Sequence, residues 1–268
     1  MFKALKGVGG ERAFNGAVIG ALVLLTLFIV GIVVSLLSYT DWNTFVVALL
    51  SEEIIFAVKL SVITATIATV ISMLIAIPVA YAISQTKFPG KDIVDSLLDL
   101  PIVISPIALG ACLLVFFNTP VGDAINSNVK FVFALPGIVL AQVTVVCALA
   151  IRLLKSAFDS IDPRYEQVGR TLGCSKPEAF FKIILPLTKN GLIAAAVLTW
   201  ARAMGEFGAT VTLAGATPMK TETLPVAIFL SLASANVGKA IAVIFILIVI
   251  AIAALLLLRK ITGKRFQI

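Results

Sequence analysis

Long apolar runs recur along the whole chain, and they constrain its fold more than any other feature. As helices, which rise about 1.5 Å per residue, such runs can cross the roughly 30 Å hydrocarbon core of a membrane. Only 13% of the 268 residues are charged, and no polar segment is long enough to fold separately. The sequence therefore predicts an all-α fold, a polytopic membrane helical bundle that forms one domain over 1–268. We expect about six transmembrane helices, at 17–38, 54–83, 97–117, 131–154, 188–207 and 238–258.

Lysine and arginine residues are unevenly distributed between the loops, and this bias predicts the topology. With the N-terminus inside, three lie before the first run, two in the 84–96 loop, seven across 152–189 and four after residue 258. These sixteen cytoplasmic residues compare with three on the opposite side, and two more lie within spans, Lys59 and Arg202. Because positively charged loops stay inside, both termini and the segment 155–187 are predicted to be cytoplasmic. The first run is longer than the core of a signal peptide, so we expect it to remain as a membrane helix.

Residues needed for ATP hydrolysis or metal binding are missing from the sequence. It contains no GxxxxGK[ST] phosphate-binding loop. It has no histidine, and Cys112, Cys147 and Cys174 lie far apart without CxxC spacing, which argues against a zinc site. We therefore expect a non-enzymatic chain with no cofactor and no metal site of its own.

Residues 162–186 read DPRYEQVGRTLGCSKPEAFFKIILP, a polar stretch inside an otherwise apolar chain. Asp162 is a suitable cap for a helix whose first residue is Pro163, where the missing N–H costs nothing. Gly173 is a suitable end for this helix, because glycine adopts the left-handed backbone conformation readily. One face of the helix carries apolar side chains with helical spacing, Tyr165, Val168 and Leu172.

A second short helix is predicted to follow directly. Ser175 and Glu178 have the spacing of a capping box at its start. Phe180 and Phe181 are among its apolar residues, and we expect Pro186 to stop it. The segment is thus predicted to form two short amphipathic helices joined at a glycine elbow on the cytoplasmic surface.

Three interpretations of the segment 155–187 follow from these patterns. It is either a solvated connecting loop with incidental helices, a DNA-binding helix-turn-helix, or a docking element for a cytoplasmic partner. A helix-turn-helix tethered at both ends to membrane spans is poorly placed to enter a DNA groove, so we expect no nucleic-acid binding. A docking element would present apolar side chains for insertion into a groove of the partner.

The segment resembles the cytoplasmic signature of ATP-binding-cassette (ABC) importer permeases, which is written EAA, then G, then I-x-LP. RTLG ends at Gly173, and the I-x-LP match ends at Pro186, thirteen positions later. At the Glu-Ala-Ala positions this chain has Gln-Val-Gly, and Glu166 lies one residue earlier. The resemblance implies a pair of coupling helices for an ATPase, formed by Arg164, Tyr165, Glu166, Gln167, Arg170, Leu172, Gly173, Ser175, Pro177, Phe180, Phe181 and Pro186.

Two further stretches, LDLPIVISPIALG (98–110) and WARAMGEFGATVTLAGATP (200–218), resemble the oxyanion branch of these permeases. The similarity is greatest to molybdate/tungstate permeases, with sulfate/thiosulfate permeases as close relatives. It implies a homodimer in the lipid of a prokaryotic inner or plasma membrane. Two cytoplasmic ABC ATPase subunits would supply ATP and magnesium, and an extracytoplasmic binding protein would deliver the oxyanion.

A translocation path is expected where hydroxyls and interrupted backbone lie within the third and fifth spans. Broken backbone at membrane depth is tolerated where it lines a cavity or is buried in protein. The alternative is that these hydroxyls bond carbonyls of their own helices and that Arg202 and Glu206 form an internal ion pair. The candidate path residues are Ser105, Pro106, Arg202, Glu206, Gly208, Thr210 and Thr212.

Two other classes of membrane protein fit the composition. A secondary transporter or channel would show internal repeats and more intramembrane ionisable residues, and neither is evident here. A purely structural membrane subunit would not need a capped cytoplasmic element. The sequence therefore favours the importer permease.

Overall fold

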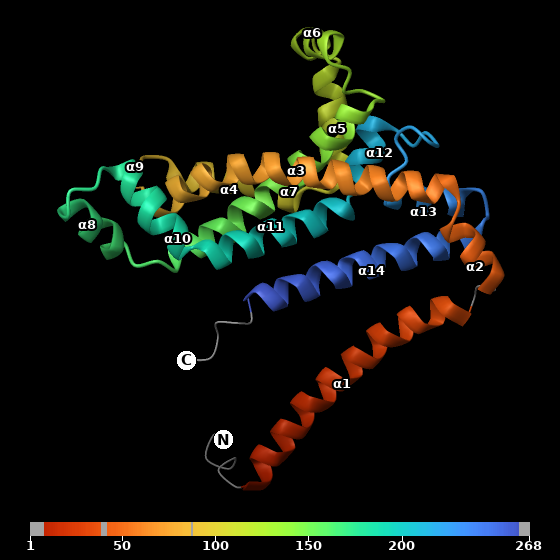
Figure 1. Ribbon diagram of the computed structural model, residues 1–268, viewed down its shortest axis with the longest axis horizontal. Coiled ribbons are helices and arrows are strands. Elements are labelled where there is room, and N and C mark those ends of the chain that lie inside the picture. The colour runs from red at the N-terminus through yellow and green to blue at the C-terminus, as the bar shows by residue number, and fades with distance from the viewer. Residues whose placement is uncertain (1–7, 39–41, 87, 263–268) are drawn as a thin grey trace.

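The computed structural model describes residues 8–38, 42–86 and 88–262, and these ranges contain helices and connecting turns without strands (Figure 1). The predicted all-α class is confirmed. The helices are, in chain order, α1 (Val8–Ser38), α2 (Trp42–Leu49), α3 (Glu52–Gln85), α4 (Lys91–Val103), α5 (Pro106–Phe117), α6 (Pro120–Asn128), α7 (Leu135–Asp159), α8 (Arg164–Thr171), α9 (Lys176–Ala179), the π-helical turn η1 (Phe180–Ile184), α10 (Leu185–Leu187), α11 (Lys189–Met204), α12 (Gly208–Ala214), α13 (Leu224–Ala233) and α14 (Val237–Thr262).

Four of the described helices, α1, α3, α7 and α14, are long and apolar enough to cross a membrane unbroken. They correspond to the first, second, fourth and sixth predicted spans. Two further pairs of helices are bent at a short break, as in a broken span or a re-entrant loop: α4 meets α5 at 108°, and Lys176–Leu187 meets α11 at 72°. If each bent pair is one span, the described chain has six, so it is a multi-pass membrane protein.

The third predicted span, 97–117, is not one continuous helix. α4 ends at Val103 and α5 begins at Pro106, and α5 then leaves the direction of α4 (Figure 1). Ser105 Oγ accepts the amide N–H of Ala108 at 3.3 Å and caps α5. Proline lacks an N–H and disfavours helical backbone in the residue before it, which places the break here. The predicted interruption of the third span at Ser105 and Pro106 is confirmed.

The fifth predicted span, 188–207, ends early, and the chain then folds back through elements that the sequence did not predict. α11 ends at Met204, and the short helices α12 and α13 follow before α14. Gly215 ends α12 with a φ of 78°. The Thr221 hydroxyl accepts the amide N–H of Thr217 at 3.1 Å and donates to the carbonyl of Gly215 at 3.2 Å. The turn between α12 and α13 is therefore held compact by its own hydrogen bonds.

α3 and α7 pack along each other at the centre of the bundle, where small side chains let the helices approach closely. Two clusters of buried apolar residues lie along this pair. One cluster includes Leu213 of α12 and Leu224 of α13. The other includes Ile83 of α3, Phe158 of α7 and Ile184 of η1. The second cluster therefore anchors the short cytoplasmic helices to the two central spans.

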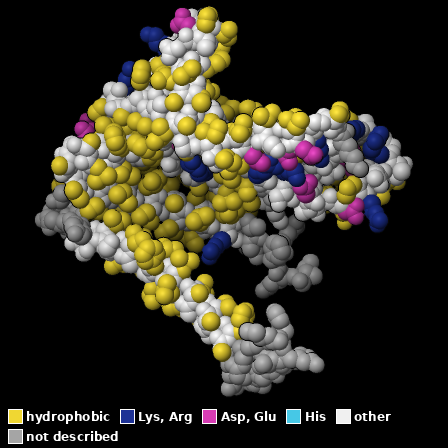
Figure 2. Space-filling model, turned by 180° about the vertical axis from the view of Figure 1, so that it is seen from behind, with side chains coloured by type: hydrophobic (Ala, Val, Ile, Leu, Met, Phe, Trp, Pro, Cys, Tyr) yellow, Lys and Arg dark blue, Asp and Glu magenta, His cyan; other side chains and the backbone are white. Residues whose placement is uncertain are grey.

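Charged and apolar side chains are unevenly distributed over the surface of the molecule. Charged side chains gather at the end that carries α8 and α9, and apolar side chains cover much of the remaining visible face (Figure 2). α14 runs back toward the same charged end, and α1 lies apart from the bundle (Figure 1). None of the apolar window of α1 is buried against the rest of the described chain. Such apolar faces are suited to contact with lipid.

Candidate coupling site and translocation path

The first short helix of the cytoplasmic segment forms as the sequence predicted, with its start one residue later. α8 begins at Arg164, and its amide N–H donates to Asp162 Oδ1 at 2.9 Å. Gly173 follows the helix with a φ of 96°, the left-handed conformation expected for the elbow. The apolar face is exposed, most of all at Leu172, which is 81% exposed. Exposed large apolar side chains on a cytoplasmic surface indicate a docking face.

The second short helix is capped as predicted. The Ser175 hydroxyl accepts the amide N–H of Glu178 at 3.4 Å, and Glu178 Oε2 accepts the amide N–H of Ser175 at 2.9 Å. Lys182 Nζ lies 2.9 Å from Glu178 Oε1. This hydrogen bond from Lys182, together with those from Ser175, lowers the pKa of the exposed Glu178 carboxyl to about 2. The cap therefore stays ionised throughout the physiological pH range.

The predicted stop at Pro186 is wrong. The chain instead makes the π-helical turn η1, in which the amide N–H of Leu185 donates to the carbonyl of Phe180. Pro186 then sits in the first turn of α10, where its missing N–H is tolerated. The change of direction comes at Thr188, whose hydroxyl donates to the carbonyl of Ile184 at 2.9 Å, and α11 follows at 72°.

α8 and η1 enclose a shallow groove of about 480 Å³, lined by Asp162, Arg164, Tyr165, Val168, Gly169, Leu172 and Ile183. Gly169 is buried, and a methyl group added there would meet the end of the Ile183 side chain. The glycine at this position therefore permits the close approach of the two elements. The groove is mostly apolar and rimmed by the charged side chains of Asp162 and Arg164, as expected for a surface that receives a partner.

Of the twelve predicted coupling residues, all are exposed except Glu166 and Phe180, which are partly buried. Glu166 is turned toward the membrane helices, where its Oε2 accepts the hydroxyl of Tyr81 on α3 at 2.7 Å. The Phe180 ring lies 4.7 Å from the Tyr81 ring and 6.4 Å from the Phe158 ring, between centroids. Sequence reasoning missed Tyr81 and Phe158, because nothing local in the sequence links them to the segment.

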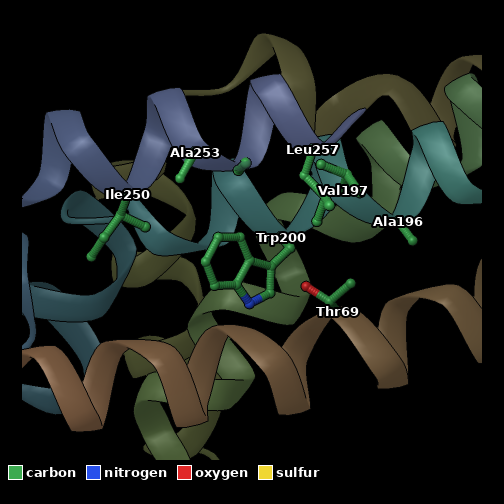
Figure 3. A pocket seen from close by; sticks show the side chains of 8 residues that line it. Thr69, Ala196, Val197, Trp200, Ile250, Ala253 and Leu257 are labelled. Carbon is green, nitrogen blue, oxygen red and sulfur yellow. The ribbon is translucent and has the colours of Figure 1, made fainter. Parts of the chain in front are cut away.

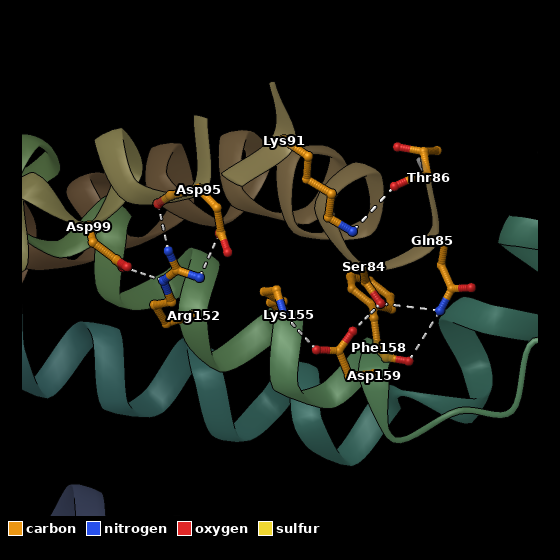
Figure 4. A network of polar contacts seen from close by, with 10 residues as sticks. All are labelled: Ser84, Gln85, Thr86, Lys91, Asp95, Asp99, Arg152, Lys155, Phe158 and Asp159. Carbon is orange, nitrogen blue, oxygen red and sulfur yellow. Dashed lines mark hydrogen bonds and ion pairs between the residues drawn. The ribbon is translucent and has the colours of Figure 1, made fainter. Parts of the chain in front are cut away.

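A polar network lies beside the coupling segment and joins α3, α4 and α7 (Figure 4). Arg152 of α7 binds two carboxylates of α4: its Nη1 lies 2.7 Å from Asp95 Oδ1, and its Nε donates to Asp99. The Ser84 hydroxyl of α3 donates to Asp159 Oδ1 of α7 at 2.6 Å. No residue of α4 is fully buried, although Leu98 packs against the second apolar cluster, so the Arg152 contacts add a polar attachment of α4 to α7.

The candidate path residues meet where α5 crosses α12. A methyl group at Gly208 would lie 2.9 Å from the amide nitrogen of Ile107, beside Pro106. A methyl group at Gly110 would lie 2.9 Å from Cα of Ala209. The two helices therefore touch through their backbones, and Ser105, Pro106 and Gly208 lie at this crossing.

The polar candidates at this crossing differ in their partners. The Thr212 hydroxyl donates to the carbonyl of Gly208 at 2.8 Å, the bond within its own helix that the alternative interpretation expected. Thr210 is fully buried, and its hydroxyl has no hydrogen bond among the described residues. Arg202 Nη1 lies 2.7 Å from Glu206 Oε2, so these two form the expected pair. The role of these residues in a translocation path stays a prediction.

A second concave surface lies between α3, α11 and α14 (Figure 3). It measures about 620 Å³ and is lined by Thr69, Ala196, Val197, Trp200, Ile250, Ala253, Ala254 and Leu257. The Trp200 indole N–H donates to the Thr66 hydroxyl at 3.1 Å. The lining is almost entirely apolar, and its Thr69 hydroxyl and Trp200 indole N–H already donate to α3, so the groove offers an oxyanion few hydrogen-bond donors.

Comparisons with known proteins agree with this architecture. The binding-protein-dependent transport system inner membrane component family matches residues 72–266. A probable molybdenum ABC transporter permease of Haloferax volcanii is 35% identical over 79% of this chain and 77% of its own. The molybdenum transport system permease ModB of Haemophilus influenzae is 32% identical over 80% of this chain and 95% of its own.

The solved structures show the same fold. A chain in the crystal structure of a bacterial alginate ABC transporter, in complex with its alginate-bound periplasmic protein, superposes with a TM-score of 0.77. It covers 99% of both chains at 18% identity. The chain therefore belongs to the binding-protein-dependent transport system inner membrane components, the permease subunits of ABC importers.

Proposed function

We propose that the chain is the membrane-spanning subunit of an ABC importer that carries molybdate or tungstate into the cytoplasm. In this proposal two copies of the chain form the path. Two cytoplasmic ABC ATPase subunits dock on the α8–α9 segments and supply the energy, with ATP and magnesium bound on them. An extracytoplasmic binding protein delivers the anion.

The observation that carries the proposal is the exposed apolar face of α8 beside the groove closed by η1. Tyr165, Val168 and Leu172 are exposed on a helix whose first amide N–H donates to Asp162 Oδ1 and which the left-handed Gly173 follows. Since the sequence has no phosphate-binding loop, the proposal places ATP hydrolysis on a separate subunit. An exposed apolar helix face on the cytoplasmic side is suited to dock in a groove of the ATPase and to follow its movement.

The choice of anion is supported by the named relatives and by the polar groups near the α5–α12 crossing. The two permeases most useful for comparison are both named for molybdenum. Arg202 is already paired with Glu206, whose other oxygen accepts the amide N–H of Ala209 in α12. Because this cation is already neutralised by its carboxylate partner, a dianion passing near the pair would be released more easily than from an unpaired cation.

The test is reconstitution of the chain in lipid vesicles with its copurifying ATPase and its binding protein. We expect uptake of molybdate or tungstate to require ATP, and ATP hydrolysis to rise severalfold when the binding protein is loaded with either anion. Sulfate and phosphate serve as comparison anions of similar tetrahedral shape.

Each part of the proposal has an outcome that contradicts it. Equal or greater stimulation by sulfate would make this a sulfate permease. Uptake by the chain alone, driven by an ion gradient without an ATPase, would place it among secondary transporters. A single copy per functional complex would contradict the homodimer.

A further inference from the structure

Tyr81 of α3 connects a membrane span to the coupling segment. It lies four residues before the end of α3 at Gln85, and its hydroxyl donates to Glu166 Oε2 of α8 at 2.7 Å. The two residues are 85 positions apart in the sequence. Among the described residues, this is the only side-chain hydrogen bond or ion pair between α8 and a spanning helix. α8 is therefore joined to a span by this hydrogen bond in addition to its packing on η1, where Gly169 meets Ile183.

The ring of Tyr81 contacts the other elements that meet at this point. Its centroid lies 4.7 Å from that of Phe180 on η1 and 5.8 Å from that of Phe158 on α7. Phe158 is fully buried and packs with Ile83 of α3 in the cytoplasmic apolar cluster. The Tyr81 ring is thus held from the bundle side, while its hydroxyl reaches the coupling segment.

The charges around Glu166 leave the tyrosine hydroxyl as its side-chain partner. Arg170, one helical turn further along α8, is exposed and forms no ion pair with Glu166 in the described structure. Lys182 is paired with Glu178 instead. A carboxylate accepts hydrogen bonds more strongly than a neutral group, so this hydroxyl–carboxylate bond is stronger than most.

We propose that Tyr81 is a positioning residue that fixes α8 to α3, so that displacement of α8 by the ATPase is passed to the span through the hydrogen bond to Glu166. This inference rests on the proposed function above. It assigns Glu166, one of the predicted coupling residues, to a contact within the chain. Phe158 and Phe180 keep the tyrosine ring in place while the bond transmits the movement.

The test uses the complete complex in vesicles and compares Tyr81→Phe with Ser84→Ala. Tyr81→Phe keeps the ring packing and removes only the hydroxyl. Ser84→Ala is the matched control, because it also removes a hydroxyl that α3 donates to a carboxylate, but on α7 instead of α8. Both variants should fold and retain the ATPase, since neither changes the exposed apolar face.

For Tyr81→Phe we expect the ratio of anion taken up to ATP hydrolysed to fall about three- to tenfold, the effect of losing a partly exposed hydrogen bond to a charged group. Amide hydrogen exchange over residues 164–171 should speed up, while exchange in α7 stays unchanged. Ser84→Ala should keep the wild-type ratio. A general loss of stability would instead raise amide exchange throughout the bundle, and it would lower the rates of anion uptake and of ATP hydrolysis together.

A double-mutant cycle with Glu166→Ala completes the test. If the pair acts as a unit, the double variant should be no worse than either single variant in the uptake ratio. Additive losses, or a wild-type ratio in Tyr81→Phe, would overturn the inference. Loss of ATPase copurification in Glu166→Ala would also overturn it, because Glu166 would then contact the ATPase directly. Failure of the proposed function itself would be visible earlier, as wild-type complex without ATP-dependent uptake.

Discussion

Arg202 and Glu206 form an ion pair whose two members differ sharply in burial. Arg202 Nη1 lies 2.7 Å from Glu206 Oε2, but the arginine side chain is 38% exposed and the glutamate side chain only 1%. Glu206 Oε1 also accepts the amide N–H of Ala209, so this carboxylate joins the end of α11 to the start of α12. Leaving the buried glutamate unpaired should therefore cost more stability than leaving the more exposed arginine unpaired.

This asymmetry predicts the order of two substitutions. Arg202→Met leaves a buried carboxylate without its cation and should lower the stability of the purified protein by about 2 kcal/mol, less than for a fully buried pair. Glu206→Gln keeps an oxygen for the Ala209 amide and leaves a half-exposed arginine, so it should cost less. Thermal unfolding in one detergent gives the comparison. If both are replaced, with Met and Gln, most of the stability should return, and equal losses for the two single variants would contradict the argument.

A second prediction concerns the elbow at Gly173. Its φ of 96° is strained for a β-branched residue, and no atom lies within 4 Å of an added methyl group. Gly173→Val should therefore act through the backbone alone, at about 1–2 kcal/mol, and reorient α9 relative to α8. We expect ATP-driven uptake to fall while membrane insertion is unchanged.

Gly90 offers the matched control for this substitution. It has a φ of 79° and equally open surroundings, but it precedes α4 instead of joining the coupling helices. Gly90→Val should carry a similar backbone cost with a smaller effect on uptake per ATP. Similar uptake ratios in the two variants would remove Gly173 from the coupling site.

The crossing of α5 and α12 predicts a steric effect of small substitutions. Gly208→Ala would bring a methyl group to 2.9 Å from the backbone nitrogen of Ile107, and backbone cannot move aside as a side chain end can. We expect a loss of about 1–3 kcal/mol in stability. Gly20→Ala in α1, which has nothing within 4 Å, should be neutral or slightly stabilising. Unfolding midpoints of the two variants test this, and an unaffected Gly208→Ala would show that the helices can separate freely.

The contacts of Arg152 predict a local loosening of α4. Arg152→Met removes the cation that holds Asp95 and Asp99, and leaves α4 with partly buried apolar packing, such as that of Leu98, to keep it against α7. Amides over 91–103 should exchange faster, with a stability loss of about 1–3 kcal/mol. Lys155→Met is the control, because Lys155 pairs with Asp159 on its own helix and should change stability by about 0.5 kcal/mol or less. Unchanged exchange in α4 would contradict the assignment of Arg152 as its anchor.

Local signals were sufficient to predict the coupling helices from sequence. Asp162 and Ser175 accept amide N–H groups two and three residues further on, and Gly173 sets the backbone at its own position. Such short-range effects can be recognised from the sequence alone. The break at Ser105 and Pro106 was predicted for the same reason, because proline restricts its neighbours directly. The prediction that Pro186 ends its helix was also based on a local pattern. Proline often follows the end of a helix, but it is equally compatible with the first turn of a helix, where Pro186 lies in α10.

Contacts between distant segments were not predictable in the same way. The hydrogen bond from Tyr81 to Glu166 depends on how α3 and α8 are placed in space. No sequence pattern around either residue indicates that the two are in contact. α12 and α13 were missed because they are short, so neither is long enough to appear as a separate span. The π-helical turn at Phe180–Ile184 likewise has no sequence pattern that distinguishes it from an ordinary helix.

The length of α3 has a consequence for the surrounding lipid. A helix of 34 residues is about 51 Å long, while the hydrocarbon core measures roughly 30 Å. α3 must therefore tilt strongly or extend beyond the hydrocarbon, and its last turns, with Tyr81 and Ser84, then lie at headgroup depth. A thicker bilayer would draw these turns toward the acyl chains and a thinner one would release them into water. Bilayer thickness should therefore influence the strength of the hydrogen bonds that Tyr81 and Ser84 donate from α3.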